Sequence, residues 1–315
     1  MMRHIFYSLL VASVLLSGCA AKNTKNTAPA AGSNAAKAAT LYKEGNYSEA
    51  LAYYEKAIDE DETPQLRNGA GATLLEGGNP AEALKEFDRA LTFMPASADL
   101  HANKGAAHLL LGQEEVAEES FDKALAYSPN NASALNGKAL LLLGKKDYES
   151  ALALLLKAEK AAPDNKAIMF NKAIAFEATG LLEDADKALT LLLEETPKDA
   201  AVRNARGIVR MKRKKYDLAK SDFTFAVALS PTTGLYYYNK AILQQRLMEY
   251  EDAVKNYTRS IAYDPTNPAA LVNRGETYVM LGKKEKGCKD LKKACDAGLC
   301  EKFESYKASR LCLED

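Results

Sequence analysis

The sequence of 315 residues contains no tryptophan, only three histidines and no excess of either charge. Because 42 lysines and arginines balance 42 aspartates and glutamates, the chain lacks the concentrated positive field that nucleic-acid binding requires. Glycine-rich phosphate loops, nucleophile elbows and the H-E-x-x-H zinc pattern are also missing. We therefore expect no enzymatic activity, no cofactor, no metal, no nucleic-acid partner and no small-molecule substrate. Alanine, leucine, lysine and glutamate dominate instead, a composition typical of helices.

The N-terminus has the layout of a secretory signal. A short basic start precedes the apolar run Ile5–Leu16, which is too short to span a bilayer. The run ends in Leu-Ser-Gly-Cys, closing at Cys19, and these four residues resemble the lipobox of bacterial lipoproteins. The resemblance implies that residues 1–18 are a signal peptide that is removed and that Cys19 receives the lipid. The alternative is an ordinary secreted protein in which this cysteine has no such role.

Residues 19–35 are predicted to form a disordered tether. They are mostly small or polar and lack large apolar side chains, so they cannot contribute to a core. As a flexible coil, about 15 residues reach roughly 20 Å. Ala20 follows the cysteine, where an aspartate would favour retention in the inner membrane of a Gram-negative cell. The resemblance to lipoproteins therefore implies an anchor in the cell envelope, in the outer membrane and facing the periplasm.

A fixed period organises the remainder of the chain. Six prolines follow one another at intervals of 34 residues: Pro95, Pro129, Pro163, Pro197, Pro231 and Pro265. Twelve residues before each proline stands an alanine, 24 before stands glycine or alanine, and eight before stands phenylalanine, leucine or tyrosine. Proline ends a helix, small residues let two helix backbones approach, and the large residue fills the space beside them. Each period therefore predicts a helix-turn-helix unit.

These columns resemble the tetratricopeptide-repeat pattern, which has small residues at positions 8, 20 and 27, a large residue at 24 and proline at 32. The resemblance covers residues 36–299. It implies an all-α fold, a right-handed α-solenoid of about eight helix-turn-helix repeats, closed by a capping helix and tail in residues 300–315. The first and last repeats lack the final proline, as expected at the ends of a stack. The first helix of each repeat is expected to line a concave groove.

The predicted groove, at positions 2, 5, 6, 9, 12 and 13 of each first helix, mixes apolar side chains such as Phe170 and Tyr238 with asparagines. An amide both donates and accepts, so a row of amides can pair with an extended peptide backbone. The row is similar to the asparagine ladder of O-linked N-acetylglucosamine transferases, except that alternate repeats shift the asparagine by one residue. The alternative is that these residues solubilise the helices or hydrogen-bond between repeats. They are Asn103, Asn171, Asn239 and Asn273 at position 6, and Asn68, Asn136 and Asn204 at position 5.

Four of the five cysteines cluster near the C-terminus, at Cys288, Cys295, Cys300 and Cys312. An even group of cysteines in an exported chain first suggests disulfides. Facing residues of an antiparallel helical hairpin have a nearly constant sum of residue numbers, which favours the nested pairs Cys288–Cys312 and Cys295–Cys300. A zinc site with four cysteine ligands is the alternative, although it lacks a C-x-x-C pair.

Together, the anchor and the repeats predict a lipid-anchored, periplasm-facing scaffold. Its partners would be other envelope proteins or peptides, bound in the groove, and the membrane, in which the lipidated Cys19 would anchor the chain. The alternative function is a lipid-anchored, chaperone-like holder of unfolded or extended polypeptides. Binding to one native partner would favour the scaffold, and broad binding to unfolded chains would favour the holder.

Overall fold

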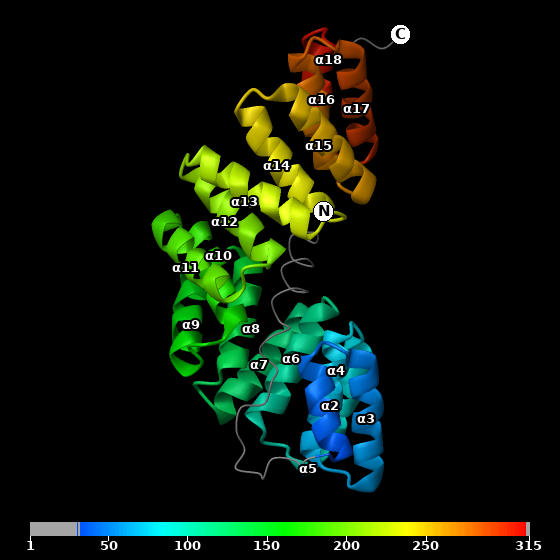
Figure 1. The fold of residues 1–315 in the computed structure, drawn as a ribbon, viewed down its shortest axis with the longest axis vertical. Coiled ribbons are helices and arrows are strands. Elements are labelled where there is room, and N and C mark those ends of the chain that lie inside the picture. Colours follow the sequence, from blue (N-terminus) through cyan, green and yellow to red (C-terminus); the bar gives the residue numbers. More distant parts are fainter. Residues whose placement is uncertain (1–29, 31, 313–315) are drawn as a thin grey trace. The chain divides into compact units, whose positions relative to one another are not determined.

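The computed structural model describes residue 30 and residues 32–312, and within them every regular element is an α-helix (Figure 1). The helices fall into two compact units, one up to Leu181 and one from Leu182 onward. The first unit contains α2 (Asn34–Lys43), α3 (Tyr47–Glu60), α4 (Pro64–Glu76), α5 (Pro80–Phe93), α6 (Ala98–Leu110), α7 (Glu114–Tyr127), α8 (Ala132–Lys145), α9 (Tyr148–Ala161) and α10 (Lys166–Ala178). The second contains α11 (Leu182–Glu195), α12 (Ala200–Lys212), α13 (Tyr216–Leu229), α14 (Gly234–Arg246), α15 (Tyr250–Tyr263), α16 (Pro268–Met280), α17 (Lys284–Asp296) and α18 (Glu301–Ala308).

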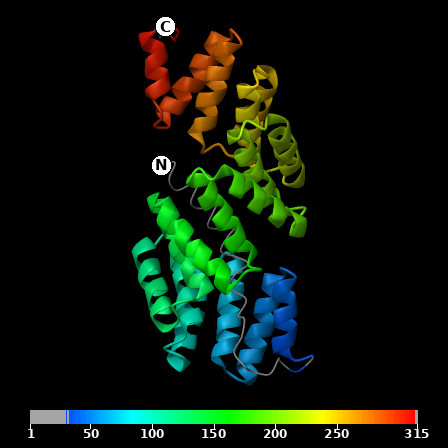
Figure 2. The same cartoon turned by 90° about the vertical axis from the view of Figure 1, so that its left-hand side faces the viewer.

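In the first unit the helices pack as consecutive pairs. Helix α2 packs on α3, α4 on α5, α6 on α7 and α8 on α9. The second helix of each pair also packs on the first helix of the next pair, and the first helices of neighbouring pairs touch, as α6 and α8 do. Figure 2 shows the same helices from a second direction. Each pair therefore buries its apolar surface against the pairs beside it in sequence.

The second unit repeats this arrangement. Helix α11 packs on α12, and the pairs α12–α13, α14–α15 and α16–α17 follow. The short helix α18 packs on α17 and ends the array. None of the helices between Asn34 and Ala308 combines the length and apolar character needed to cross a membrane.

The predicted fold class, an all-α solenoid of helix-turn-helix repeats with a C-terminal capping helix, is confirmed. Helix α2 begins at Asn34, slightly before the predicted start of the repeats at residue 36. Helix α18 begins directly after Cys300, where the capping helix was expected. The predicted signal peptide, the lipid site Cys19 and the tether as far as residue 29 lie outside the described residues.

Local sequence sets both ends of the first helices. Asn165 accepts hydrogen bonds from the backbone N–H groups of Ala167 (3.0 Å) and Ile168 (3.2 Å), which otherwise have no partner in the helix. Side chains in the same position act alike at Thr63, Ser97, Asn131, Asp199 and Asn267. After the first helix the backbone takes a positive φ, as at Gly112 (73°) and, without glycine, at Met248 (62°). These signals place the helix ends at the same point in each period.

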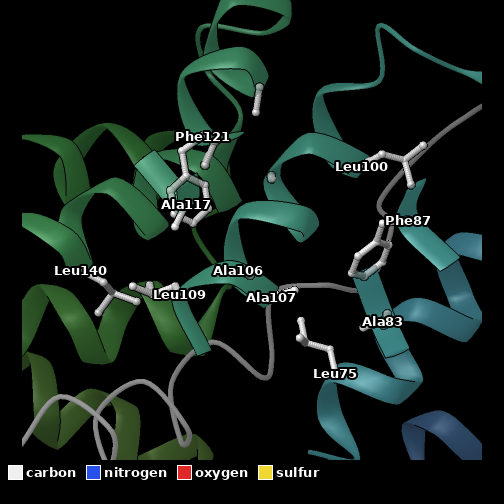
Figure 3. Packing of buried hydrophobic residues seen from close by; sticks show 14 of the residues in the cluster. Leu75, Ala83, Phe87, Leu100, Ala106, Ala107, Leu109, Ala117, Phe121 and Leu140 are labelled. Atoms are coloured by element: carbon white, nitrogen blue, oxygen red, sulfur yellow. The ribbon is translucent and has the colours of Figure 1, made fainter. Parts of the chain in front are cut away.

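In three pairs, α4–α5, α6–α7 and α12–α13, the core is built on contact between a glycine in the first helix and a phenylalanine ring in the second. A Cβ atom added to Gly105 would lie 2.6 Å from Cε1 of Phe121, and one added to Gly207 would lie 2.7 Å from Cε1 of Phe223. Both rings are almost completely buried. Figure 3 shows Phe121 in this core, with Ala106 and Ala107 on α6. The glycine column is therefore required by close packing.

Another pair solves the same packing problem with different residues. On α8 this column holds Ala139, and on α9 Leu155 stands in place of phenylalanine. Both side chains are completely buried. The extra methyl group on the first helix is thus matched by a smaller side chain on the second.

We predict that Gly207→Ala lowers the free energy of unfolding by about 1–3 kcal/mol, because the added methyl group overlaps the ring of Phe223. Phe223→Leu introduced with it should recover part of the loss, since the pair Ala–Leu already serves elsewhere in the chain. Denaturant unfolding of the single and double variants measures this, with exposed Ser221→Ala as the control. Helix propensity alone would make Gly207→Ala stabilising by about 1 kcal/mol, so the sign of the change decides.

Candidate protein-binding surface

The asparagines expected to line the groove form hydrogen-bonded pairs between neighbouring first helices. Three of the four asparagines at position 6 donate from Nδ2 to the Oδ1 atom of the asparagine at position 5 of the preceding repeat. The pairs are Asn103 to Asn68 (2.8 Å), Asn171 to Asn136 (2.7 Å) and Asn239 to Asn204 (2.9 Å). The one-residue shift between alternate repeats is therefore the geometry that lets two amides on adjacent helices meet.

Burial leaves most of these amides little access to a ligand. Asn171 is 0 % exposed, and Asn103, Asn136, Asn204 and Asn239 are buried as well. Each pair uses one donor and one acceptor between the repeats. The structure thus favours the inter-repeat role over a continuous ladder for these five residues. The half-buried Asn68 and Asn273 remain candidates for contact with a peptide.

The second unit presents partly open apolar side chains on its first helices. We call this surface the α12–α14–α16 face and define it by Ile208, Met211, Tyr238, Ile242 and Asn273, all half-buried. Beneath it, Phe223, Leu243 and Tyr257 are completely buried. The face is therefore the outer layer of a closed core, with side chains that can lose further water on binding.

Polar groups on this face have fixed positions. The hydroxyl of Tyr238 accepts a hydrogen bond from Nδ2 of Asn273 (3.1 Å), and the Tyr257 hydroxyl donates to Oε1 of Gln245 (2.7 Å). The rings of Tyr238 and Tyr257 are tilted against each other, with centroids 5.9 Å apart. Burial raises the pKa of Tyr238, so its hydroxyl stays protonated at neutral pH and available as a donor. Protein interfaces combine an apolar centre with a limited number of hydrogen bonds, and this face offers groups for both.

In the first unit, several of the corresponding side chains are more deeply buried, although Ile174 is half-buried like Ile208 and Ile242. Phe170 is only 9 % exposed, and Ala102 and Ala106 are buried. Glu76, on α4, is an unexpected feature of this unit. Burial raises the pKa of its carboxyl to about 8, although a hydrogen bond with Tyr42 acts in the opposite direction. The Oε1 atom of Glu76 has no hydrogen-bond partner among the residues that the structure describes.

An ion-pair network that sequence reasoning missed ties α11, α12 and α13 together. Arg206 pairs with Asp222 (2.7 Å), and Arg210 bridges Asp222 (2.8 Å) and Asp186 (3.0 Å). Arg213 also pairs with Asp186. Arg274 and Asp290 form the equivalent pair on α16 and α17, at the same separation of 16 residues. The repeated spacing of 16 residues between arginine and aspartate is the sequence signal that predicts these pairs. Because they are paired, the arginines are committed to carboxylates within the unit.

The four C-terminal cysteines are disulfide-bonded in the structure, as Cys288–Cys312 and Cys295–Cys300. Their Cα atoms lie 5.4 and 3.9 Å apart, and the pairs are the nested ones. Leu291 and Phe303 form a small apolar cluster with Cys288, Cys295 and Cys312. The described residues contain no group of three or more histidine, cysteine, aspartate or glutamate side chains placed to hold a metal ion. The disulfides thus join α17 and the terminal segment where few apolar side chains are available.

We predict that Asn136→Ala lowers the free energy of unfolding by about 1–3 kcal/mol, because it leaves the buried amide of Asn171 without its partner. In a chain that already carries Asn136→Ala, the substitution Asn171→Ala should lower the free energy of unfolding by less than it does in the unchanged chain. A double-mutant cycle by denaturant unfolding measures this difference. Exposed Lys157→Ala on α9 serves as the control. Single variants as stable as the control would show that the pairs do not couple the repeats.

Comparisons with known proteins agree with the periodicity. Models described as "Tetratricopeptide repeat" match residues 36–99, 75–132 and 102–166, and another match covers residues 142–208. A model described as "TPR repeat" matches residues 249–282. The TPR repeat-containing thioredoxin TTL4 of Arabidopsis thaliana is 38 % identical over 76 residues, which are 24 % of this chain and 11 % of that protein.

Solved structures show the same fold at low sequence identity. The APC/C hetero-tetramer Cut9–Hcn1 contains a chain with a TM-score of 0.75 and 16 % identity, matched over 89 % of this chain and 55 % of that one. A human IFIT1 dimer with m7Gppp-AAAA gives a TM-score of 0.59 and 17 % identity, over 96 % of this chain and 75 % of that one. The chain spans about half of the matched Cut9–Hcn1 chain and about a tenth of the thioredoxin. With the repeat models covering most of residues 36–282, the chain belongs to the tetratricopeptide-repeat family.

Proposed function

We propose that this chain is a protein-binding scaffold and that it holds its partner on the α12–α14–α16 face. The observation that carries the proposal is the half-buried row of Ile208, Met211, Tyr238 and Ile242 above a fully buried core. Covering these side chains removes apolar surface from water, which is the main driving force of protein association. Tyr238 and Asn273 add hydrogen-bonding groups that can fix the register of a bound segment.

The fold by itself does not select the class of ligand. The Cut9–Hcn1 structure is a complex of proteins, whereas the IFIT1 structure contains a capped oligonucleotide. The residues of this chain favour a protein. Its formal net charge is zero, and Arg206, Arg210 and Arg274 are paired with aspartates. On the helices of the proposed face, these arginines are therefore not available to the phosphates of an oligonucleotide.

We propose further that Cys19 is lipidated and anchors the scaffold in the cell envelope, in the outer membrane and facing the periplasm. The proposal is supported by the likeness of Leu-Ser-Gly-Cys to a lipobox and by the apolar run before it. Acyl chains hold a protein at a membrane through the additive burial of methylene groups, so more than one chain gives a firm anchor. Mass spectrometry of the N-terminal peptide tests this part directly.

A lipid-anchored holder of unfolded polypeptides is the second candidate. It is favoured by the flexible side chain of Met211 and by the partial openness of the apolar face, since both suit loosely specified apolar segments. The two functions differ in which ligand saturates the binding surface. A scaffold binds one native partner with a defined stoichiometry, whereas a holder binds many unfolded chains and releases them on refolding.

We predict that Tyr238→Ala with Ile242→Ser reduces capture of a native envelope partner at least about tenfold, because it removes the central anchor of the face. The measurement is affinity capture from detergent-solubilised envelopes, followed by saturation binding of the purified partner. The matched control is Leu218→Ser, which changes a side chain that is 47 % exposed on the outer helix α13.

Thermal unfolding of each variant should confirm that the fold persists. Full capture by the Tyr238→Ala/Ile242→Ser variant, or equal loss in the control, would contradict the proposed site. Capture of unfolded polypeptides alone, with no saturable native partner, would favour the holder over the scaffold.

A further inference from the structure

The second helix of the last repeat differs in charge from the other second helices. Six exposed lysines stand at its start and along its length: Lys283, Lys284, Lys286, Lys289, Lys292 and Lys293. Only Glu285 and Asp296 are exposed carboxylates there, since Asp290 is buried and paired with Arg274. We call these six residues the lysine face of α17. Because the formal charge of the whole chain is zero, this excess of positive charge is a local feature.

At the equivalent positions of other repeats, the second helix carries an ion pair where α17 carries two lysines. Glu82 and Lys85 form an ion pair on α5 (2.8 Å), and Asp252 and Lys255 form one on α15 (2.9 Å). The same two positions of the period on α17 hold Lys286 and Lys289. Like charges at this spacing destabilise a helix, and cations near its N-terminus oppose the helix dipole. Folding of the repeat therefore gives no reason for these lysines.

The lysines are also free of partners within the unit. Across residues 32–312, no ion pair or hydrogen bond engages the side chain of any of the six. Glu285 lies one turn before Lys289, but the two do not pair. By contrast, the lysines on α5, α7, α11 and α15 pair with carboxylates on the same helix. The charge of the lysine face is thus available to an external anion.

We propose that the lysine face of α17 binds the surface of a bilayer that contains anionic phospholipids. Protein interfaces are enriched in arginine and aromatic residues and depleted in lysine, and α17 has no arginine and no aromatic residue. Lysine is a flexible point charge that can follow mobile head-group phosphates without a fixed geometry. Clusters of four to eight basic residues on a helix are typical of binding to anionic lipid surfaces.

The lysine face complements the proposed anchor. A lipid chain and a basic patch together give more stable membrane attachment than either gives alone. The inference rests on the proposed anchoring at Cys19 only for the choice of a bilayer as the anionic surface, and it does not depend on the α12–α14–α16 face. Membrane contact through α17 would restrict how the second unit can turn relative to the bilayer.

The test compares binding of the full chain to two kinds of vesicle, phosphatidylcholine alone and phosphatidylcholine mixed with phosphatidylglycerol. The variant Lys286→Glu/Lys289→Glu/Lys293→Glu reverses three charges on the face. The control Lys85→Glu/Lys123→Glu/Lys157→Glu makes the same change in net charge at exposed positions of the first unit. We expect phosphatidylglycerol to tighten binding of the unchanged chain and the control by about tenfold or more, with no such gain in the α17 variant. The gain should weaken as salt is added.

Several results would overturn the proposal. One such result is that the α17 variant still binds more tightly when phosphatidylglycerol is present. Another is that the α17 variant and the control lose this gain equally, which would show an effect of net charge alone. Tight binding of a DNA duplex through α17, without any gain from phosphatidylglycerol, would assign the face to nucleic acid. Failure of the anchor at Cys19 would look different, because it would weaken binding to both kinds of vesicle alike and leave the difference between them unchanged.

Discussion

The structure depends on one contact, between a small residue on the first helix of a repeat and a large one on the second. Gly105 against Phe121 and Gly207 against Phe223 show how little space the contact leaves. Repetition of that contact sets the distance between the helices of a pair. With the spacing fixed, every pair presents the same two surfaces to its neighbours, and a chain without tryptophan can bury its core by stacking pairs.

The helices and their order could be predicted from sequence because the signals that define them are local. Prolines, capping residues such as Asn165 and the alanine column act within one period, so a single sequence reveals them. The nested order of the C-terminal cysteines is also local. The asparagine pairs, the Arg210 network and the burial of Glu76 depend on which side chains meet across neighbouring helices. That register is fixed by packing, so spacing alone gave an incomplete ladder where the structure has pairs.

The same division between local and tertiary effects separates the surfaces of the molecule. On the first helices of the second unit, packing leaves Ile208, Tyr238 and Ile242 half-buried, which gives an apolar surface supported by a rigid core. On α17, lysines replace the ion pairs that stabilise the second helices of other repeats, such as α5 and α15. This gives a charged surface without partners in its own unit. One surface suits a protein and the other a lipid head group. A scaffold held at a membrane would use both at once.

The central claim is that the α12–α14–α16 face holds the partner, and site-specific photocrosslinking tests it most directly. A photoreactive residue at Ile242 reports on the face, and one at Leu218 reports on the outer helix α13 of the same unit. The account predicts partner adducts from position 242 in intact envelopes and none from position 218. Adducts from position 218 alone would contradict it, because the partner would then lie on the outer helices.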